Sequence, residues 1–210
     1  MKPIILIGGG GHCISCIDVI EQTGLYQILG ILDVPEKLGI KVLNYSIIGT
    51  DNELDQFLPD CSDFLITVGQ IKSSSVREKI FLTVKKAGGN LPVIISPIAH
   101  VSKYANIAEG TIVMHHAFIN AEAFIGKGCI INTKALIEHE TIIGNFCHIS
   151  TAAIANGQVR IGDCCFIGSN TVIANNTNVA AKTIIAAGSQ VLRSIDASGT
   201  YIGQPLRKVR

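Results

Sequence analysis

The sequence is poor in charge and in aromatic side chains. Only 16% of its 210 residues are charged, against about 25% in a typical soluble protein, and it has no tryptophan. Its formal net charge of +1 argues against nucleic acid or an anionic membrane as a partner. Although 48% of the chain is hydrophobic, it lacks the run of about 18 apolar residues that a spanning helix needs. The apolar excess therefore predicts a soluble architecture that buries much of the chain.

An export signal and an even set of cysteines are also missing. The apolar run over 4–7 is too short for a secretory segment and leads directly into glycines. Seven cysteines, an odd number, make a disulfide framework unexpected, and we expect a cytoplasmic protein. Cys13 and Cys16 form a C-x-x-C pair, which alone is weak evidence for a redox or zinc site, so their role stays open.

Residues 1–97 alternate short apolar runs with helical patterns. The pattern predicts strands over 3–7, 28–32, 64–68 and 93–95, a helix between residues 14 and 24, and a second helix over 74–86. This alternation of strand and helix is typical of a small parallel sheet flanked by helices, as in a Rossmann-like α/β domain.

From residue 101 the sequence repeats every six residues. An aliphatic residue recurs at each sixth position over 101–191 with the single exception of Ala155, and a short side chain follows four places after each. Neither an α-helix nor a simple strand has this period. A triangular coil with three six-residue sides does, and its stacked turns bury a continuous core. The repeat predicts a parallel β-helix whose narrow interior is filled in part by Cys129, Cys147 and Cys165.

Several motifs carry a resemblance to a known family. Hexads in which glycine follows the aliphatic residue resemble those of hexapeptide-repeat acyltransferases, as in Ile125-Gly126, Ile143-Gly144, Ile161-Gly162 and Ile167-Gly168. Further motifs are similar to those of bacterial sugar acetyltransferases of the NeuD/PglD type: Gly8-Gly9-Gly10-Gly11-His12, Ile137-Glu138-His139-Glu140, Cys147-His148-Ile149-Ser150 and Gly199-Thr200-Tyr201-Ile202-Gly203-Gln204-Pro205.

The resemblance implies a complete architecture. It implies a Rossmann-like nucleotide-sugar-binding domain over 1–97, a left-handed parallel β-helix acetyltransferase domain over 98–194 and a C-terminal tail over 195–210. It also implies a homotrimer with active sites between subunits, acetyl-CoA as co-substrate in the groove between neighbouring β-helices, and no metal. Small-molecule nucleotide sugar and acetyl-CoA are then the partners, with no nucleic acid and no membrane.

His139 is the leading candidate for catalysis. It is third in its hexad, where a side chain points outward, and Glu140 follows it. A histidine beside a carboxylate can act as a general base for an amine or hydroxyl that attacks a thioester, because the carboxylate stabilises the imidazolium. The same pair also occurs on protein surfaces without any role. The resemblance implies that His139 is the catalytic base, that Glu140 activates it, and that His148 meets the thioester end of acetyl-CoA.

The favoured mechanism is direct attack of the acceptor on acetyl-CoA, with backbone N–H groups stabilising the tetrahedral intermediate. The resemblance assigns coenzyme contacts to Gly157, Ser169 and Ala187 as well as to His148. The methyl group of Ala187 stands where glycine is common and narrows the groove slightly. The C-terminal part of the chain carries a basic tail of Arg193, Arg207, Lys208 and Arg210. These side chains either contact the CoA phosphates or are simply exposed to solvent.

The glycine loop offers free backbone N–H groups to an anion such as the diphosphate of a nucleotide sugar or of NAD. It matches a dinucleotide fingerprint only in part, because Cys13 stands at the third glycine position. The resemblance implies that the nucleotide sugar is contacted by Gly10, Gly11, His12 and Asp33. Two further candidates follow from position: the stretch that begins with Gly69 reaches the same sheet edge, and Asn132 either positions the acceptor or caps a β-helix corner.

The favoured function is an acetyl-CoA-dependent N-acetyltransferase that acts on a UDP-linked 4-amino sugar for bacterial glycan biosynthesis. An amine acceptor is preferred because a nucleotide-type domain fits a nucleotide-linked substrate. O-acetylation of a sialic-acid-like sugar would use the same base and stays an alternative.

Three other classes are alternatives. A gamma-type carbonic anhydrase needs three converging histidines, and no pair among His115, His116, His139 and His148 has that family's spacing of five. A non-catalytic trimeric scaffold would leave the histidine and glutamate idle. An NAD-binding oxidoreductase is disfavoured, because residues 1–97 are few for a full doubly wound domain.

Overall fold

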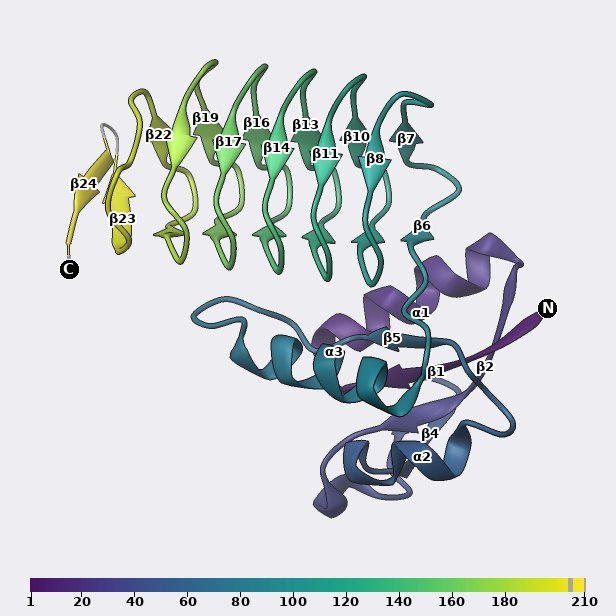
Figure 1. Ribbon diagram of the computed structural model, residues 1–210. Coiled ribbons are helices and arrows are strands. Elements are labelled where there is room, and N and C mark those ends of the chain that lie inside the picture. Colours follow the sequence, from purple (N-terminus) through teal and green to yellow (C-terminus); the bar gives the residue numbers. More distant parts are fainter. Residues whose placement is uncertain (204–205, 210) are drawn as a thin grey trace.

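A computed structural model describes residues 1–203 and 206–209 of the protein. An N-terminal α/β domain is followed by a long triangular prism of stacked coils (Figure 1). Gln204 and Pro205 of the tail motif and Arg210 of the basic tail lie outside the described residues. Within the described part of the chain, no helix has both the length and the apolar character needed to cross a bilayer.

The N-terminal domain contains a five-stranded sheet with the order β3-β4-β2-β1-β5. All neighbours are parallel except β3 and β4, which form a hairpin. Four successive residues of β1 are buried, as expected for a parallel strand covered on both faces. The sequence did not predict the two hairpin strands. The strand bounds are β1 (Lys2–Ile7), β2 (Tyr26–Leu32), β3 (Lys41–Val42), β4 (Tyr45–Gly49) and β5 (Phe64–Ile66).

Both predicted helices form, as α1 (Gly11–Thr23) and α3 (Ser75–Ala87). α1 begins after Gly10 with no side-chain cap and no acidic residue in its first turn, so its first N–H groups are free of side-chain acceptors. It ends at Gly24, whose φ of 64° is left-handed. Shorter helical turns complete the domain: η1 (Pro35–Lys37), η2 (Asp51–Glu53) and α2 (Leu54–Phe57).

The strand predicted over 93–95 forms as β6 (Ile94–Ile95), but it does not extend the N-terminal sheet. It pairs in parallel with β9 (Ile112–Val113), with Ile94 opposite Ile112. This offset of 18 residues is the coil length of the β-helix, so the six-residue period begins one hexad earlier than the sequence indicated. The backbone N–H of Ile94 donates to Thr111 O at 3.0 Å, which fixes this register.

The prism is a left-handed parallel β-helix, as predicted. From β6 to β22 its strands pair in parallel with strands one coil away, as Phe118 with Leu136 and Ile119 with Ile137, and at the end β24 pairs antiparallel with β23. The docked face contains β6, β9, β12 (Ile130–Ile131), β15 (His148–Ile149), β18 (Phe166–Ile167), β21 (Ile184–Ile185), β23 (Thr200–Gly203) and β24 (Leu206–Lys208). The first free face contains β7 (His100–Val101), β10 (Phe118–Ile119), β13 (Leu136–Ile137), β16 (Ile154–Ala155), β19 (Val172–Ile173) and β22 (Gln190–Val191). The second free face contains β8 (Asn106–Ile107), β11 (Phe124–Ile125), β14 (Ile142–Ile143), β17 (Arg160–Ile161) and β20 (Asn178–Val179).

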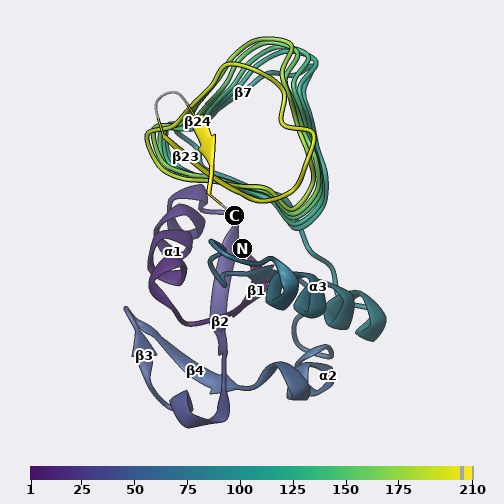
Figure 2. The ribbon, with the colours of Figure 1, turned by 90° about the vertical axis from the view of Figure 1, so that its left-hand side faces the viewer.

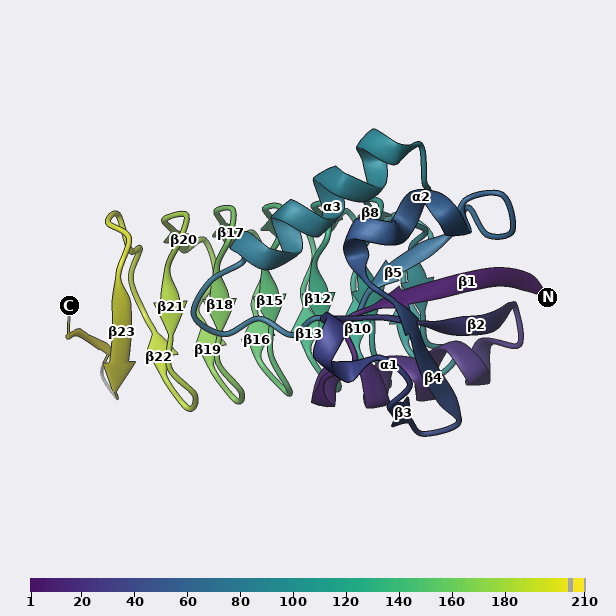
Figure 3. The same cartoon turned by 90° about the horizontal axis from the view of Figure 1, so that it is seen from below.

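The N-terminal domain covers one side of the triangle, as the view along the prism axis shows (Figure 2). At the α1 corner, between the docked and first free faces, His115 Nε2 donates to Asp18 Oδ2 of α1 at 2.7 Å. At the α3 corner, between the second free and docked faces, Phe146 meets Phe81 of α3 edge to face. The third corner, between the two free faces, lies opposite the docked face, and we call it the free corner. The hairpin β23–β24 projects past the N-terminal domain (Figure 3).

The interior of the prism follows the repeat. The aliphatic position is buried throughout the middle coils, and Cys129, Cys147 and Cys165 are fully buried, unpaired thiols, which confirms the predicted packing. Each of these thiols also donates to a carbonyl oxygen of the next coil, as Cys147 Sγ does to Gly162 O at 3.1 Å. Burial raises the pKa of Cys147, so this thiol stays protonated.

The outward-pointing residues differ between faces. On the docked face, Ile112 and Ile130 are fully buried against the N-terminal domain. On the free faces, Phe118 is 38% exposed and Phe124 is 47% exposed. Within the described part of one chain, large apolar side chains on two flat faces therefore stay partly exposed.

Candidate active site

The free corner carries an imidazole and a carboxylate in contact. His139 and Glu140 follow β13, and His139 Nδ1 lies 3.1 Å from Glu140 Oε2. Because a carboxylate only accepts, Nδ1 carries the hydrogen and Nε2 keeps a free lone pair in the neutral ring. Gln158 Nε2 donates to the same Glu140 oxygen at 3.0 Å and holds the carboxylate in place. The His139 side chain is 52% exposed, so an external ligand can reach it.

Gly157 lies one coil after His139 and directly against its ring. A Cβ built on Gly157 would lie 2.7 Å from both Cε1 and Nε2 of His139. No positive φ requires glycine at this position. The missing side chain therefore makes room for the imidazole, and Gly157 belongs to the His139 site.

His148 lies in the seam between the β-helix and the N-terminal domain, not on an open surface. It is only 7% exposed. Its Nδ1 donates to the backbone oxygen of Gln70 at 2.6 Å, and its Nε2 accepts from Asn132 Nδ2 at 3.0 Å. Asn132 also caps its own corner, since its Oδ1 accepts from the N–H of Thr133 at 2.8 Å. Asn132 thus satisfies the corner-capping interpretation and orients His148 as well.

His12 completes this seam. Its ring centroid lies 6.5 Å from that of His148, and a Cβ on Gly69 would lie 3.5 Å from the His12 Cβ. Burial, and then the charge of Arg77, lower the pKa of His12 to about 3. Burial also lowers the pKa of His148 to about 4, with Arg77 contributing in the same direction. Both rings are therefore neutral near pH 7.

Arg77 of α3 is the main residue of the seam that sequence reasoning missed. It is 1% exposed. Its Nη1 donates to Ile66 O at 3.0 Å and to Val68 O at 2.6 Å, and its Nη2 donates to Gly128 O of the β-helix at 2.8 Å. The sequence did hold a signal, because this arginine stands at helical spacing with the buried Ile80, Phe81 and Val84.

A groove of about 390 Å³ lies at the start of α1. Gly9 is fixed there by Asp33, whose Oδ2 accepts from its N–H at 2.7 Å and from Lys37 Nζ at 2.9 Å. Partial burial acts in the opposite direction, but the hydrogen bonds from Lys37, Val34 and Gly9 hold the pKa of Asp33 below its usual value. The groove is lined by Gly9, Gly10, Gly11, Ile14, Lys37, Ile40, Lys41, Val42, Leu43 and Ile47.

The remaining candidates lie at the α1 corner in later coils. Ser169 Oγ lies 3.0 Å from the Oγ of Ser150, and Ala187, one coil further on, is exposed. The sequence-predicted residues thus form four groups: the free-corner pair with Gly157, the seam, the groove, and this late stretch of the α1 corner. One chain does not bring the free corner and the groove together, because the prism separates them.

Known proteins resemble this chain in sequence and in fold. The family model of the PglD N-terminal domain matches residues 3–84. PerB from Caulobacter crescentus, in complex with CoA and GDP-perosamine, has a TM-score of 0.93 at 28% identity and covers 100% of this chain and 98% of its own. The acetyltransferase domain of PglB from Neisseria gonorrhoeae, in complex with acetyl coenzyme A, has a TM-score of 0.90 at 28% identity and covers 99% of each chain. This chain is therefore similar over nearly its full length to these sugar acetyltransferases, and its N-terminal part matches the PglD N-terminal domain.

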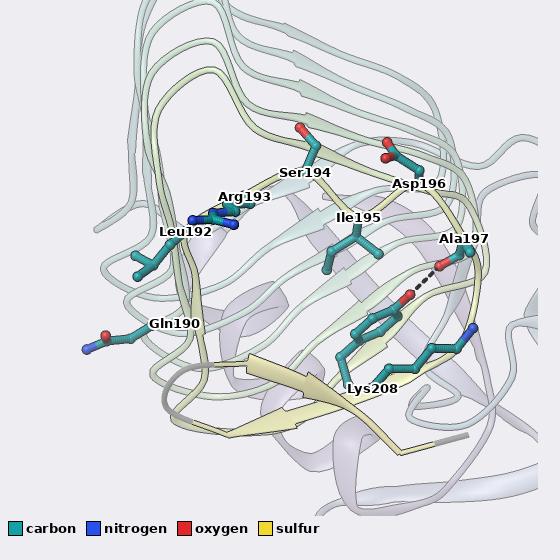
Figure 4. A pocket seen from close by; sticks show the side chains of 9 residues that line it. Gln190, Leu192, Arg193, Ser194, Ile195, Asp196, Ala197 and Lys208 are labelled. Carbon is teal, nitrogen blue, oxygen red and sulfur yellow. Dashed lines mark hydrogen bonds between the residues drawn. The ribbon is translucent and has the colours of Figure 1, made fainter.

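A further cavity is lined by none of the residues of these four groups. It has a volume of about 660 Å³ and sits at the C-terminal end of the prism (Figure 4). Tyr201 closes part of it, and its hydroxyl donates to Ala197 O at 2.8 Å. Arg193 and Lys208 of the basic tail both line this cavity.

Three of the histidines considered as zinc ligands are dispersed over the structure. His115 is held between Asp18 and Ser96, while His139 and His148 lie on opposite sides of the prism. Among the described residues, no three histidine, cysteine or acidic side chains gather as metal ligands do. The three converging histidines of a gamma-type carbonic anhydrase are therefore not assembled within the described part of one chain.

Proposed function

We propose that this enzyme transfers the acetyl group of acetyl-CoA to the amino group of a nucleotide-linked 4-amino sugar, in the cytoplasm. Residues 1–97 bind the nucleotide sugar, and residues 98–194 carry the acetyl transfer. A UDP-linked sugar is the acceptor expected from the sequence. The relatives support the reaction class, since the Caulobacter structure is a complex with CoA and GDP-perosamine and the Neisseria structure is a complex with acetyl coenzyme A.

The contact between His139 and Glu140 carries this proposal. The acceptor nitrogen attacks the thioester carbonyl carbon, and His139 Nε2 takes the proton that the nitrogen releases. Glu140 stabilises the imidazolium that results. The tetrahedral intermediate then expels the CoA sulfur, which takes the proton from the His139 imidazolium, and the products are the sugar amide and free CoA.

The acceptor follows a path along the N-terminal domain. The nucleotide occupies the groove near Asp33, and its diphosphate meets the N–H groups at Gly10 and Gly11, where α1 begins without a cap. The sugar then extends past His12 and Gly69 toward the seam. In this arrangement Asn132 and His148 border the reacting end of the acceptor and the thioester.

The separation of groove and free corner leads us to propose a homotrimer with shared active sites. His139 lies on the corner opposite the docked face, so a second chain must present its groove to it. The exposed Phe118 and Phe124 on the free faces supply apolar area for contact between copies. Acetyl-CoA then lies between neighbouring β-helices, where it meets Gly157 from one copy and Ser169 and Ala187 from the next.

A thiol-release assay tests the reaction. Acetyl-CoA is offered with a UDP-linked 4-amino sugar, GDP- and dTDP-linked amino sugars, and free sialic-acid-type sugars. We expect CoA release with nucleotide-linked amino sugars. Release only with sialic-acid-type sugars would favour O-acetylation, and no release with any acceptor would favour a non-catalytic scaffold.

Mixing two inactive variants tests the shared site. His139→Ala removes the base, and Gly11→Trp fills the groove at a position where a Cβ meets nothing within 4 Å. If sites form between chains, random co-assembly restores about a quarter of the sites, because each site takes one half from each of two chains. No restoration would show that one chain supplies both halves.

A further inference from the structure

The side chains that line the groove at the start of α1 are of only two kinds. Lys37 and Lys41 are cationic, and every other lining residue that the structure describes is glycine or aliphatic. No residue that lines the groove offers a side-chain carboxylate, amide or hydroxyl group to the hydrogen-bonding edge of a nucleobase, and the neighbouring carboxylate of Asp33 is engaged by Gly9, Val34 and Lys37. The groove therefore has strong means to bind phosphate and weak means to tell one base from another.

We infer that the enzyme recognises its acceptor through the diphosphate, by Lys37, Lys41 and the N-terminus of α1, and selects the base only by shape. Uridine, thymidine and guanosine diphosphate sugars are then all accepted when the sugar is the same. This inference rests on the proposed function and names the substrate class as nucleoside diphosphate sugars without a fixed base.

Lys37 is placed to exchange partners. Its Nζ now lies 2.9 Å from Asp33 Oδ2. Asp33 also accepts from the N–H groups of Gly9 and Val34, both at 2.7 Å, so it keeps hydrogen bonds when Lys37 turns to a phosphate. Lys41 lies on the same groove with an exposed side chain. Two ammonium groups facing an uncapped helix start provide charge for a diphosphate.

The four glycines of the loop divide into two kinds. A Cβ on Gly8 would lie 2.5 Å from Val68, and one on Gly9 would lie 3.1 Å from Asp33, so packing requires both glycines. A Cβ on Gly10 or Gly11 would meet nothing within 4 Å, and neither residue has a positive φ. The fold does not need glycine at these two positions. Their missing side chains keep the groove floor open next to the helix start.

Leu43 lies at the edge of the groove. It occupies the turn between β3 and β4 with a φ of 52°, a left-handed conformation that disfavours leucine. It is the one left-handed non-glycine residue among those described outside the β-helix. Its side chain is 52% exposed and lines the groove. The exposed side chain of Leu43 can therefore pack against the face of the base when a nucleotide occupies the groove.

Apolar walls limit how strongly a base can be selected. A site that pairs with polar groups rejects a wrong partner by about 10⁴-fold or more, whereas a hydrophobic site discriminates by about 10- to 200-fold through shape. Ile14, Ile40 and Leu43 form such walls here. We expect kcat/KM for UDP- and GDP-linked forms of one amino sugar to differ by less than about 100-fold.

Titration calorimetry on the full chain tests the inference without acetyl transfer. The probes are UDP, GDP, UMP and uridine. We expect UDP and GDP to bind within about tenfold of each other and UMP to bind at least about tenfold more weakly, since half of the phosphate charge is missing. Lys37→Gln and Lys41→Gln should each weaken UDP by about tenfold and leave uridine unchanged. Lys79→Gln on the exposed side of α3 is the matched control.

Leu43→Gly separates binding from folding. It relieves the left-handed strain, so the melting temperature should stay the same or rise, while UDP and GDP both bind more weakly. A preference of more than about 1,000-fold for one base, or equal binding of UMP and UDP, would overturn the inference. If no nucleotide binds while acetyl transfer to a free sugar proceeds, both this inference and the nucleotide-linked acceptor of the proposed function are refuted. Tight binding of only one nucleoside diphosphate would refute this inference and leave the proposed function intact.

Discussion

Two histidines of the same β-helix lie in opposite environments. His139 stands at the free corner, half exposed, with one ring nitrogen on a carboxylate and the other open. His148 stands on the docked face, buried, with both ring nitrogens bonded. The repeat sets only the direction in which each side chain points. The second domain decides which of them remains accessible, so one histidine is available as a base and the other is a neutral part of a seam.

Removal of the base is the largest expected effect. His139→Ala should lower kcat by at least about 100-fold, the usual scale for loss of a general base, with the assembly unchanged. The measurement is a steady-state thiol-release assay alongside size-exclusion chromatography. His116→Asn serves as the matched control, because His116 is exposed at a corner and asparagine tolerates its φ of 57°. Activity near that of the wild type in His139→Ala would refute the assignment.

Crowding the base is the next largest effect. Gly157→Ala places a methyl group where His139 Cε1 and Nε2 now lie, and the imidazole must move. We expect kcat to fall by some tens of fold, because a displacement of about 1 Å can cost up to 10²-fold. Thermal unfolding should change little. In Gly126→Ala, by contrast, the new Cβ would lie 2.6 Å from the backbone carbon of Gly144, so that variant should lose stability. Equal loss of stability in both variants would contradict this distinction.

The buried seam should make the protein sensitive to acid. Folded His148 has a pKa of about 4 and folded His12 of about 3, whereas in the unfolded chain both return toward 6.5. Between pH 6.5 and pH 4 the unfolded state therefore binds more protons, and stability falls as the pH falls. Each histidine contributes about 1.4 kcal/mol per pH unit, or tenfold in the unfolding constant.

Urea denaturation at several pH values measures this slope. His12→Asn should reduce it, because His12 Nε2 has no hydrogen-bond partner among the described residues and its loss breaks no bond of that atom. A slope equal in wild type and His12→Asn would show that His12 is not the group that titrates.

The smallest effect concerns Cys164. It is the one cysteine of the seven that is not buried, although its pKa is raised by partial burial. A thiol reagent should modify it first under native conditions and change activity by less than about twofold, because it lies at the α3 corner and away from the base. Mass spectrometry and the thiol-release assay check this outcome. Early labelling of Cys147 would contradict the tightly packed interior.

The features that follow from the six-residue repeat could be predicted from the sequence. The hexads identified the three-sided coil, the buried cysteines and the outward direction of His139, because each follows from position within six residues. It did not predict the seam. Arg77 reaches an oxygen 51 residues away, and His148 reaches one 78 residues away. Contacts of that length depend on how the two domains dock, which leaves no periodic trace in either of them.

The same limit applies to β6 and to the groove. Ile94 reads as one more strand of the α/β sheet because it follows a helix, yet its partner is Ile112 of the β-helix. Lys37 and Lys41 look like ordinary surface lysines until the turn between β3 and β4 brings them beside Gly10. Charge and burial at these positions emerge from the tertiary structure and not from composition.

The pairing of strands one coil apart restricts how this protein can change in length. A single residue inserted into a strand would turn every later aliphatic side chain toward solvent, and a deletion would do the same. Insertions and deletions are therefore tolerated only as whole coils of three hexads, or as loops that extend from a corner. In protein engineering, the distance between two sites along the β-helix axis can therefore be changed only in steps of one coil.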